Sequence, residues 1–435
     1  MKDRYLIVAS VDALVFEDLE YAKTLPMFNK ILNDGALIER VKTIYPSLTH
    51  PVHATIMTGC SAGATGIVSN EVFESGKEER PWNNWLRQVK CETIFHAAKK
   101  SGLTTCACRW PLTAGGGDVI DYLIPEVLKP DMIGYEDNPV EAYRNVGCGE
   151  NVIDIVESAL GKYGYENNHP AYDEFEIYCA ARIIKRYKPN VLFTHPGYVD
   201  AERHRTGLFS DEVKESIKVT DGWLKMLWDA VCDAGIEDKT DFVVLSDHGH
   251  LNISRYVSPN VFLAQKGLIK LNSGGSVASW DAYATGGGLS SLVYLSRPDD
   301  ATLKNKVYEI LDNMAKEKIY GFEKVFTKEE VRKLYDLDGE FSFVLETDGY
   351  SGFVENCTGD AVMVIERENP KQGASSHGHL PNKGPQPVFI GMGPSFKKGI
   401  VIPNGDMLDH APTFAKILGV ELKSAQGKVK EEILK

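Results

Sequence analysis

Aspartate and histidine side chains occur along this chain at spacings that suit the binding of metal ions. Asp200 and His204 lie four residues apart, so one turn of a helix would bring both to one face. Asp247 is followed directly by His248, and His377 lies in a short segment that contains glycine. Carboxylate oxygens and imidazole nitrogens are both ligands that divalent zinc accepts. With one more carboxylate, these residues are enough to hold two divalent ions.

The elements that must position these residues are strands of a sheet. Short apolar runs, bounded by turn residues and separated by helical patterns, predict an α/β fold with a mainly parallel central sheet flanked by helices. Asp12, Asp200 and Asp247 each come after one of these runs, and ligands bind at the carboxyl ends of the strands in open α/β sheets. The runs are Tyr5–Val11, Val191–Thr194, Phe242–Leu245 and Pro387–Ile390.

Each motif taken alone also has an ordinary structural interpretation. An aspartate after a strand is most often a helix cap, Asp-His-Gly is most often a turn, and an Asp-x-x-x-His spacing arises by chance in many helices. Caps and turns do not explain why all these residues lie at predicted strand ends. The combination therefore favours a metal centre at one edge of the sheet.

Helices are predicted between the strands. Ser210 is suited to cap a helix that carries acidic residues in its first turn and stops at Gly235. Two further helices are expected over residues 24–35 and 93–102. The residue pattern of the stretch 257–356 differs from the strand-and-helix pattern of the rest of the chain. It contains three consecutive glycines at 286–288 and acidic, turn-rich connections around a helix near Leu303–Met314. We expect an inserted cap-like subdomain at 257–356 and a discontinuous catalytic α/β domain at 1–256 and 357–435.

The composition limits the possible partners. The chain has 435 residues, 43% of them hydrophobic, and a formal net charge of −13, which excludes a disordered or collagen-like protein and offers no basic surface for a nucleic-acid polymer. No apolar stretch approaches the roughly 20 residues that cross a bilayer, so no membrane partner is expected. The opening Met-Lys-Asp-Arg lacks a secretory pattern, which predicts a cytoplasmic location. An anionic substrate would then need positive charge from bound metal ions.

Several segments, taken in order, resemble one enzyme superfamily. They are the opening Val11-Asp12, Tyr45–Gly59, the turn Gly66–Asn70, Asp200–His204, Asp247–Gly249, and His377-Gly378 followed by Gly393–Gly399. This series is similar to that of the alkaline phosphatase superfamily, and most closely to its nucleotide pyrophosphatase/phosphodiesterase branch. The resemblance spans nearly the whole chain and implies an alkaline-phosphatase-like fold.

The resemblance assigns roles residue by residue. It makes Thr49 the nucleophile that forms a phosphothreonine intermediate, and it gives Asn70 the role of holding a non-bridging phosphate oxygen. It implies two divalent ions, for which we favour Zn²⁺ with Mn²⁺ as the alternative. One ion would be held by Asp200, His204 and His377, and the other by Asp12, Asp247, His248 and the Thr49 oxygen. His250 and His379 are expected to support the ligands from behind. Thr65 and Val52 depart from the family pattern, where His and Asn are usual.

The substrate implied is a small phosphoester, nucleotide-like or phosphonate compound. Phosphonoacetate hydrolase, a phosphomonoesterase and a non-catalytic metal-binding protein remain as alternatives, whereas a sulfatase is excluded because threonine cannot become formylglycine. A phosphodiesterase is favoured because neither the Thr49 segment nor the Asn70 turn contains an arginine to meet a monoester dianion. The segment Arg109–Pro111 or the inserted subdomain could line the space for a second substituent, although Trp110 fits a buried position beside a strand equally well.

Overall fold

An eight-stranded sheet carries the predicted ligands in the computed structural model, which describes residues 3–75, 80–126, 134–135, 137–164, 168–366 and 373–435. The strand order is β19-β2-β18-β6-β1-β5-β3-β4. Neighbouring strands are parallel except that β18 is antiparallel to both β2 and β6. The α/β prediction with a mainly parallel sheet is therefore confirmed. The strands are β1 (Tyr5–Ser10), β2 (Gly35–Lys42), β3 (Thr105–Cys108), β4 (Tyr122–Ile124), β5 (Val191–Thr194), β6 (Thr240–Leu245), β18 (Phe389–Met392) and β19 (Val401–Asp406).

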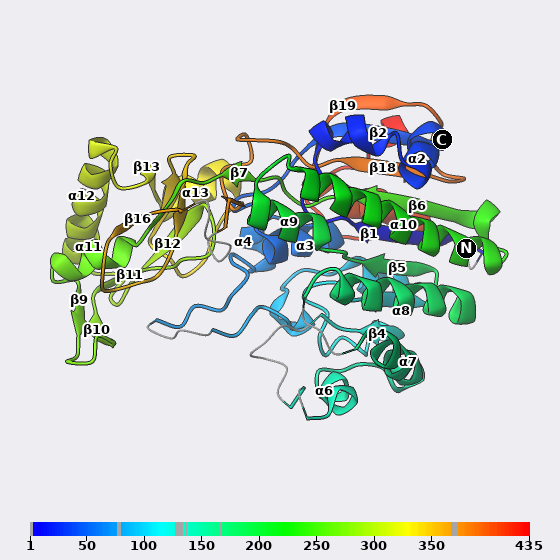
Figure 1. Cartoon of the computed structure of the whole chain (residues 1–435), viewed down its shortest axis with the longest axis horizontal. Coiled ribbons are helices and arrows are strands. Elements are labelled where there is room, and N and C mark those ends of the chain that lie inside the picture. The colour runs from blue at the N-terminus through cyan, green and yellow to red at the C-terminus, as the bar shows by residue number, and fades with distance from the viewer. Residues whose placement is uncertain (1–2, 76–79, 127–133, 136, 165–167, 367–372) are drawn as a thin grey trace.

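Helices cover both faces of this sheet (Figure 1). Alternate residues of β1 divide between the two sides: Ile7 and Ala9 pack with one helical layer, whereas Leu6 and Val8 pack with the other. The strands are buried on both faces, which explains why they read as continuous apolar runs in the sequence. The first layer contains α2 (Pro26–Asp34), α7 (Ile153–Tyr163), α8 (Ala171–Tyr187) and α10 (Asp211–Asp233), and the second contains α3 (Thr49–Thr58), α5 (Ile94–Lys100) and α14 (His410–Leu418).

The predicted helix boundaries agree with local capping chemistry. The Ser210 hydroxyl accepts a hydrogen bond from the Val213 N–H and begins α10, as expected. Pro26 is the first residue of α2, where its missing N–H costs nothing. The short helices α1 (Leu19–Ala22), α4 (Ala62–Thr65) and α6 (Pro139–Asn145) complete the main body.

A second, antiparallel sheet lies beside the main body, to the left in Figure 1. Its order is β11-β12-β14-β13, and its buried side chains form a cluster with those of α11 and α12. The predicted helix near Leu303–Met314 lies within α12. The elements are β11 (Ala282–Ala284), β12 (Ser290–Leu295), β13 (Phe322–Thr327), β14 (Phe343–Thr347), α11 (Pro259–Gln265), α12 (Ala301–Glu317), α13 (Lys328–Tyr335) and the hairpin β9 (Ile269–Leu271) with β10 (Val277–Trp280).

The proposed division of the chain at residues 257 and 356 stays a prediction. A three-stranded sheet, β15-β8-β16, spans the first of these points, because β8 (Arg255–Val257) pairs with β15 (Ser351–Phe353) and with β16 (Val362–Val364). Side chains of β12 and β14 also pack with the main body, through Leu292 and Val344. The two parts therefore share a boundary rather than a linker.

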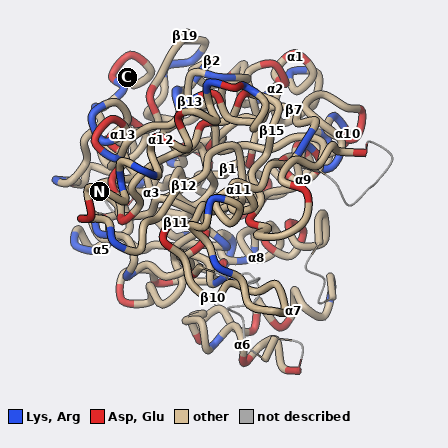
Figure 2. Tube along the Cα trace, turned by 90° about the vertical axis from the view of Figure 1, so that its left-hand side faces the viewer, with Lys and Arg blue, Asp and Glu red and all other residues tan. Residues whose placement is uncertain are grey.

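None of the helices in the described ranges is both long and apolar enough to span a membrane. Acidic and basic residues are interspersed along helices and loops (Figure 2). The cytoplasmic location stays a prediction.

Candidate metal centre

The sheet brings the predicted ligands to one edge. Asp12 follows β1 and Asp247 follows β6, and these strands are adjacent and parallel, with Ser10 opposite Leu245. Beyond β5, the helix α9 (Tyr198–Thr206) carries Asp200. These carboxylates therefore meet because three parallel strands end side by side. His377 follows the short strand β17 (Ser375–Ser376), which pairs with β7 (Leu251–Asn252).

Asp12, Asp247 and His248 form the first compact group of possible ligand atoms. His248 Nε2 lies 3.5 Å from Asp12 Oδ1 and 3.2 Å from Asp247 Oδ2. The Thr49 hydroxyl, on the first residue of α3, lies 3.3 Å from the same nitrogen. The Ala13 N–H donates to Asp247 Oδ1 over 3.2 Å and orients that carboxylate. The four residues assigned to one ion by resemblance are thus brought together.

The second compact group contains Asp200, His377, His248 and His250. His250 Nε2 lies 2.6 Å from Asp200 Oδ1, whereas His204 Nε2 lies 3.5 Å from Asp200 Oδ2 and His377 Nε2 lies 3.9 Å from Asp200 Oδ1. The predicted ligands of this ion are adjacent, with His204 just outside the compact group. His250, which the sequence analysis placed behind the ligands, directly contacts Asp200 and is a further candidate ligand.

Backbone carbonyl groups fix how two of these imidazoles are protonated. His204 Nδ1 lies 2.9 Å from the Ser375 carbonyl oxygen, and His377 Nδ1 lies 3.0 Å from the Ser47 carbonyl oxygen. A carbonyl oxygen only accepts, so each Nδ1 carries a hydrogen and each Nε2, on the side of Asp200, is the nitrogen left to bind an ion. This is the tautomer that an imidazole needs to bind a metal through Nε2.

The electrostatics of the cluster favour a cation. Burial, together with the charges of Asp200 and Asp247, raises the pKa of Asp12 well above its usual range, and burial raises the pKa of Asp247 to about 6. Burial also lowers the pKa of His377 to about 4, which keeps its imidazole neutral at pH 7. Asp12 Oδ1 and Asp247 Oδ2 have no hydrogen-bond partner within the described ranges. Crowded carboxylates and neutral imidazoles are the donor set that divalent ions require, so these residues fit two ions.

A third compact group, formed by His53, His195 and Asp247, is less suited to bind an ion. His53 Nδ1 lies 2.7 Å from the Thr49 carbonyl oxygen and therefore donates to it, and His53 Nε2 accepts from the Ser10 hydroxyl over 3.0 Å. Both nitrogens of His53 are therefore already engaged within the protein. His195 Nε2 lies 3.1 Å from Asp12 Oδ2 and supports that carboxylate from the side of β5.

A cavity of about 1040 Å³ opens onto Thr49, Asn70, Asp200, His204 and His377. The Asn70 side-chain oxygen accepts the His50 N–H over 2.9 Å, which holds this amide beside Thr49. The rest of the wall includes residues that the sequence analysis did not identify, because no local motif marks them: Glu71, Arg80, Trp82, Tyr256, Tyr283, Phe353 and Glu355.

Of the two expected linings, the segment Arg109–Pro111 does not line this wall, whereas the stretch 257–356 does, through residues such as Tyr283 and the glycines at 286–288. Trp110 is fully buried and packs edge-on against His53, with 4.7 Å between the ring centres. The alternative prediction for Trp110, a buried position beside a strand, is therefore the correct one. Arg109 is buried against Tyr172. The cavity does contain an arginine, Arg80, which comes from outside the segments considered, but it is paired with Glu71 over 2.8 Å and with Glu355.

Comparison with known proteins identifies the family to which these features belong. The sequence profile of the type I phosphodiesterase/nucleotide pyrophosphatase family matches residues 6–368. The chain belongs to this family. The prediction of the family is therefore confirmed.

Proteins of similar sequence carry phosphodiesterase names. Ectonucleotide pyrophosphatase/phosphodiesterase family member 1 of Rattus norvegicus is 24% identical over 259 residues, which are 57% of this chain and 24% of the relative. Venom phosphodiesterase of Naja atra is 25% identical over 260 residues, which are 57% of this chain and 26% of the relative. The matched part thus spans about a quarter of the length of these relatives.

The fold comparison covers more of the chain. Murine ectonucleotide pyrophosphatase/phosphodiesterase 5 has a TM-score of 0.67 at 18% identity, over 99% of this chain and 100% of that chain. A structure of an inactive variant of the same murine protein, in complex with AMP, gives the same values. The human form of that protein gives a TM-score of 0.68 at 18% identity. These likenesses establish the fold.

The two departures from the pattern of the phosphodiesterase family lie in the interior. Val52, on α3, is fully buried and packs in the apolar cluster beneath the sheet. Thr65 is also fully buried, and its hydroxyl donates to the Ala62 carbonyl oxygen over 3.2 Å. Neither residue lines the cavity at Thr49.

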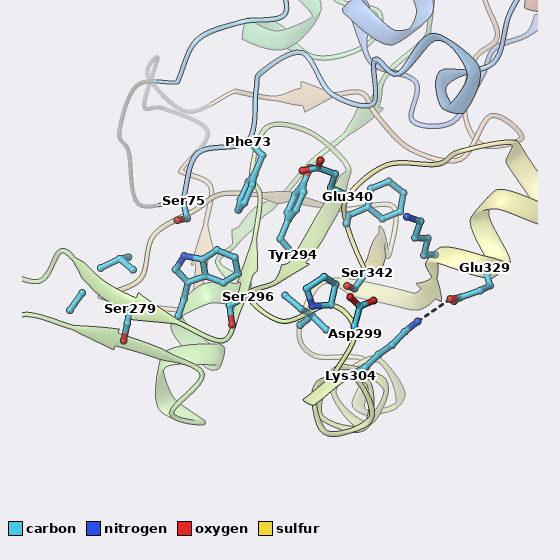
Figure 3. A pocket seen from close by; sticks show the side chains of 17 residues that line it. Phe73, Ser75, Ser279, Tyr294, Ser296, Asp299, Lys304, Glu329, Glu340 and Ser342 are labelled. Atoms are coloured by element: carbon cyan, nitrogen blue, oxygen red, sulfur yellow. Dashed lines mark hydrogen bonds and ion pairs between the residues drawn. The ribbon is translucent and has the colours of Figure 1, made fainter. Parts of the chain in front are cut away.

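Another cavity, of about 1010 Å³, lies in the part formed by the second sheet and the Phe73 segment (Figure 3). The Phe73 and Tyr294 rings stack there, 3.7 Å between centres, and Lys304 pairs with Glu329 over 2.9 Å. None of the predicted site residues lines this cavity.

Proposed function

We propose that this protein is a metal-dependent phosphodiesterase of the nucleotide pyrophosphatase type, with Thr49 as its nucleophile. The observation that carries the proposal is the position of the Thr49 hydroxyl, 3.3 Å from His248 Nε2, in the wall of a cavity that also exposes Asp200 and His377. A threonine hydroxyl is a weak nucleophile until its pKa is lowered, so its place beside a ligand cluster favours a catalytic role.

Two divalent ions, Zn²⁺ by preference and Mn²⁺ as the alternative, would be held by the two compact groups. Asp12, Asp247, His248 and Thr49 would hold one, and Asp200, His204 and His377 the other, with His250 as a further ligand. Such ions lower the pKa of a coordinated hydroxyl and stabilise charge on a transferring phosphoryl group. The donor chemistry favours zinc because the ligands mix imidazole and carboxylate.

The residues of the chain then define a two-step displacement. Thr49 Oγ attacks phosphorus, a phosphothreonine forms, and the first alcohol or phosphate leaves. Water hydrolyses the phosphothreonine and restores the Thr49 hydroxyl. The start of α3 at Thr49 places the positive end of the helix dipole at this oxygen, which favours negative charge there. The Asn70 amide, held beside Thr49 by the His50 N–H, is placed to donate to a non-bridging oxygen.

The cavity wall supports a diester substrate in preference to a monoester. Asn70 is a neutral donor, and the Arg80 charge is opposed by Glu71 and Glu355, so the described side chains of the wall add little positive charge to that of the proposed ions for a phosphate dianion. Trp82, which lines the cavity and is partly exposed, supplies apolar surface for a second substituent such as a nucleoside. We therefore propose nucleotide-type phosphodiester or pyrophosphate bonds as substrates.

The experiment compares wild type, Thr49→Ala and Thr49→Ser after loading with Zn²⁺ or Mn²⁺. The substrates are bis-p-nitrophenyl phosphate, the p-nitrophenyl ester of thymidine monophosphate, p-nitrophenyl phosphate and phosphonoacetate. Thr49→Ala should abolish turnover while leaving fold and metal content largely intact, and Thr49→Ser should keep part of the turnover. Near-normal hydrolysis by Thr49→Ala would mean that water attacks directly. A clear preference for p-nitrophenyl phosphate would establish a phosphomonoesterase, and turnover of phosphonoacetate alone would establish a phosphonate hydrolase.

Metal analysis tests the ligand assignment separately. We expect two ions per chain in wild type and a loss of occupancy in Asp12→Ala and in His377→Ala, because each removes a ligand from a different group. If wild type binds no more than one ion and neither variant changes occupancy, the two-metal assignment is wrong.

A further inference from the structure

A buried carboxylate of the second sheet, which the proposed function does not use, joins two segments of the active site. Glu346 lies on β14 and is fully buried. Its Oε2 accepts the Tyr45 hydroxyl over 3.0 Å. Its Oε1 accepts the Leu380 N–H over 3.1 Å and lies 2.7 Å from the Lys383 ammonium group. One side chain thus receives donors from two segments that are far apart in the sequence.

These two segments are the ones that carry the proposed nucleophile and one proposed ligand. Tyr45 comes four residues before Thr49, and Leu380 comes three residues after His377. Ser47 links the same segments directly, because its hydroxyl donates to the His379 carbonyl oxygen over 2.9 Å and its own carbonyl oxygen accepts His377 Nδ1 over 3.0 Å. The position of His377 relative to Thr49 therefore depends on how these segments are held together.

The second sheet makes another contact with the His377 segment beside Glu346. Ser290, at the start of β12, is paired with Glu346 on β14, and the preceding Leu289 N–H donates to the His377 carbonyl oxygen over 2.7 Å. Gly288 has a φ of +140°, and a Cβ there would lie 2.8 Å from the same carbonyl oxygen. Only glycine permits this close approach. Two neighbouring strands thus hold the His377 segment at adjacent points.

The cost of burying Glu346 explains why its partners stay in place. A carboxylate removed from water is stable only if its oxygens receive hydrogen bonds or a counter-charge. Burial raises the pKa of Glu346 to about 7, and the Lys383 charge opposes that rise. Separation of the Tyr45 segment from β14 would deprive Oε2 of its donor, and separation of the Leu380 segment would deprive Oε1 of its donors, which favours the arrangement in which both segments are bound.

We propose that Glu346 is a positioning residue through which the second sheet sets the distance between the Thr49 segment and the His377 segment. The proposal rests on the proposed roles of Thr49 and His377. It gives the second sheet a function beyond lining the cavity: the sheet fixes the geometry of the metal centre. Glu346 itself touches neither the substrate nor the proposed ions.

The test compares Glu346→Gln and Tyr45→Phe with a matched control, Glu323→Gln. Glu323 is the other carboxylate on Lys383, 2.7 Å from its ammonium group, but its side chain is 51% exposed and this bond reaches neither Tyr45 nor Leu380. Glu346→Gln keeps the size of the side chain and removes its charge, and Tyr45→Phe removes one hydroxyl. Two measurements are made, kcat and KM for a phosphodiester and the visible absorption spectrum of the protein loaded with Co²⁺, whose bands report ligand geometry.

We expect Glu346→Gln to lower kcat on the order of 10- to 100-fold with a smaller change in KM, because a misplacement of about 1 Å has this effect. Tyr45→Phe should lower kcat less, and the double variant should lose less than the product of the single losses, because both changes act on one network. The cobalt spectrum should shift in Glu346→Gln and stay unchanged in Glu323→Gln.

The inference is overturned if Glu346→Gln and Tyr45→Phe match Glu323→Gln in both kcat and cobalt spectrum. If Glu346→Gln does not fold, Tyr45→Phe decides alone on the same measurements. If wild type hydrolyses no phosphoester, the proposed function fails, whereas the cobalt spectra still show whether Glu346 sets the geometry at His377. The two failures are therefore distinguishable.

Discussion

The charge of Asp247 should make the metal-free protein less stable than a variant with a neutral side chain of the same size. Asp247 is fully buried, and burial raises its pKa from 3.8 to about 6. The folded protein therefore binds the proton of the Asp247 carboxyl more tightly than the unfolded chain does. The stabilisation of the folded state by this bound proton is complete below pH 3.8 and is lost as the pH rises through 6. At about 1.4 kcal/mol per pKa unit, the ionised carboxylate costs about 3 kcal/mol at pH 7.5.

Asp247→Asn should therefore invert the order of stability according to whether metal is present. The asparagine oxygen can still accept the Ala13 N–H, so the loop keeps its hydrogen bond. Without metal, the variant should be more stable than wild type by roughly 1–3 kcal/mol, since it removes a buried charge. With Zn²⁺ at about 100 times its dissociation constant, wild type should gain about 3 kcal/mol and the variant much less.

Urea unfolding at pH 7.5, with EDTA and then with excess Zn²⁺, measures both effects. Repeating the EDTA series at pH 5 should shrink the difference, because the wild-type carboxyl is then largely protonated. Asp241→Asn is the matched control: Asp241 is buried on the same strand, β6, but it accepts the Ser395 N–H over 2.9 Å, away from the ligands. It should show the full zinc gain of wild type. An Asp247→Asn protein that is less stable than wild type in EDTA, or that gains as much from zinc, would refute this reasoning.

Three further predictions concern stability and substrate binding. Arg203→Met should lower the free energy of unfolding by about 3–5 kcal/mol, because it leaves the buried Asp18 without this partner. Arg205→Met, on the same helix but at a more exposed ion pair, should lower it by less than about 1 kcal/mol. Equal losses in the two variants would contradict this prediction. Burial lowers the pKa of His410 to about 3, so the folded protein binds this proton less tightly than the unfolded chain does. The contribution of neutral His410 to the free energy of unfolding is therefore complete above about pH 6.5 and decreases as the pH is lowered. Wild type should lose stability between pH 7 and pH 5, and in His410→Phe this loss should be about 2 kcal/mol smaller in urea titrations. An unchanged pH profile would exclude this assignment. Trp82→Ala should raise KM about 3- to 10-fold for thymidine monophosphate p-nitrophenyl ester but not for p-nitrophenyl phosphate, because only the former has a second substituent to contact the ring.

The sequence alone predicted the features of this protein that depend on local pattern. Continuous apolar runs identify β1, β5 and β6 because a strand buried on both faces has no polar side to display. The residues just after those strands then meet at one edge as a geometric consequence of parallel pairing. Asp12, Asp247, His248 and Thr49 could be grouped in advance for this reason and through the family motif, and the structure brings them together.

Only the tertiary structure decided which side chains complete the site. His250 lies between Asp200, 50 positions earlier, and the Ser375 hydroxyl of β17, 125 positions later, and contacts both. Trp82 and Arg80 line the cavity, whereas Trp110 is buried away from it. No local spacing in the sequence predicts this packing. Glu346 meets Tyr45 across 301 positions. Strand and helix periodicity constrains only residues that are near one another along the chain. Contacts between distant segments cost loop-closure entropy, and the packing of the complete fold must offset that cost, so the complete fold decides which of these contacts form.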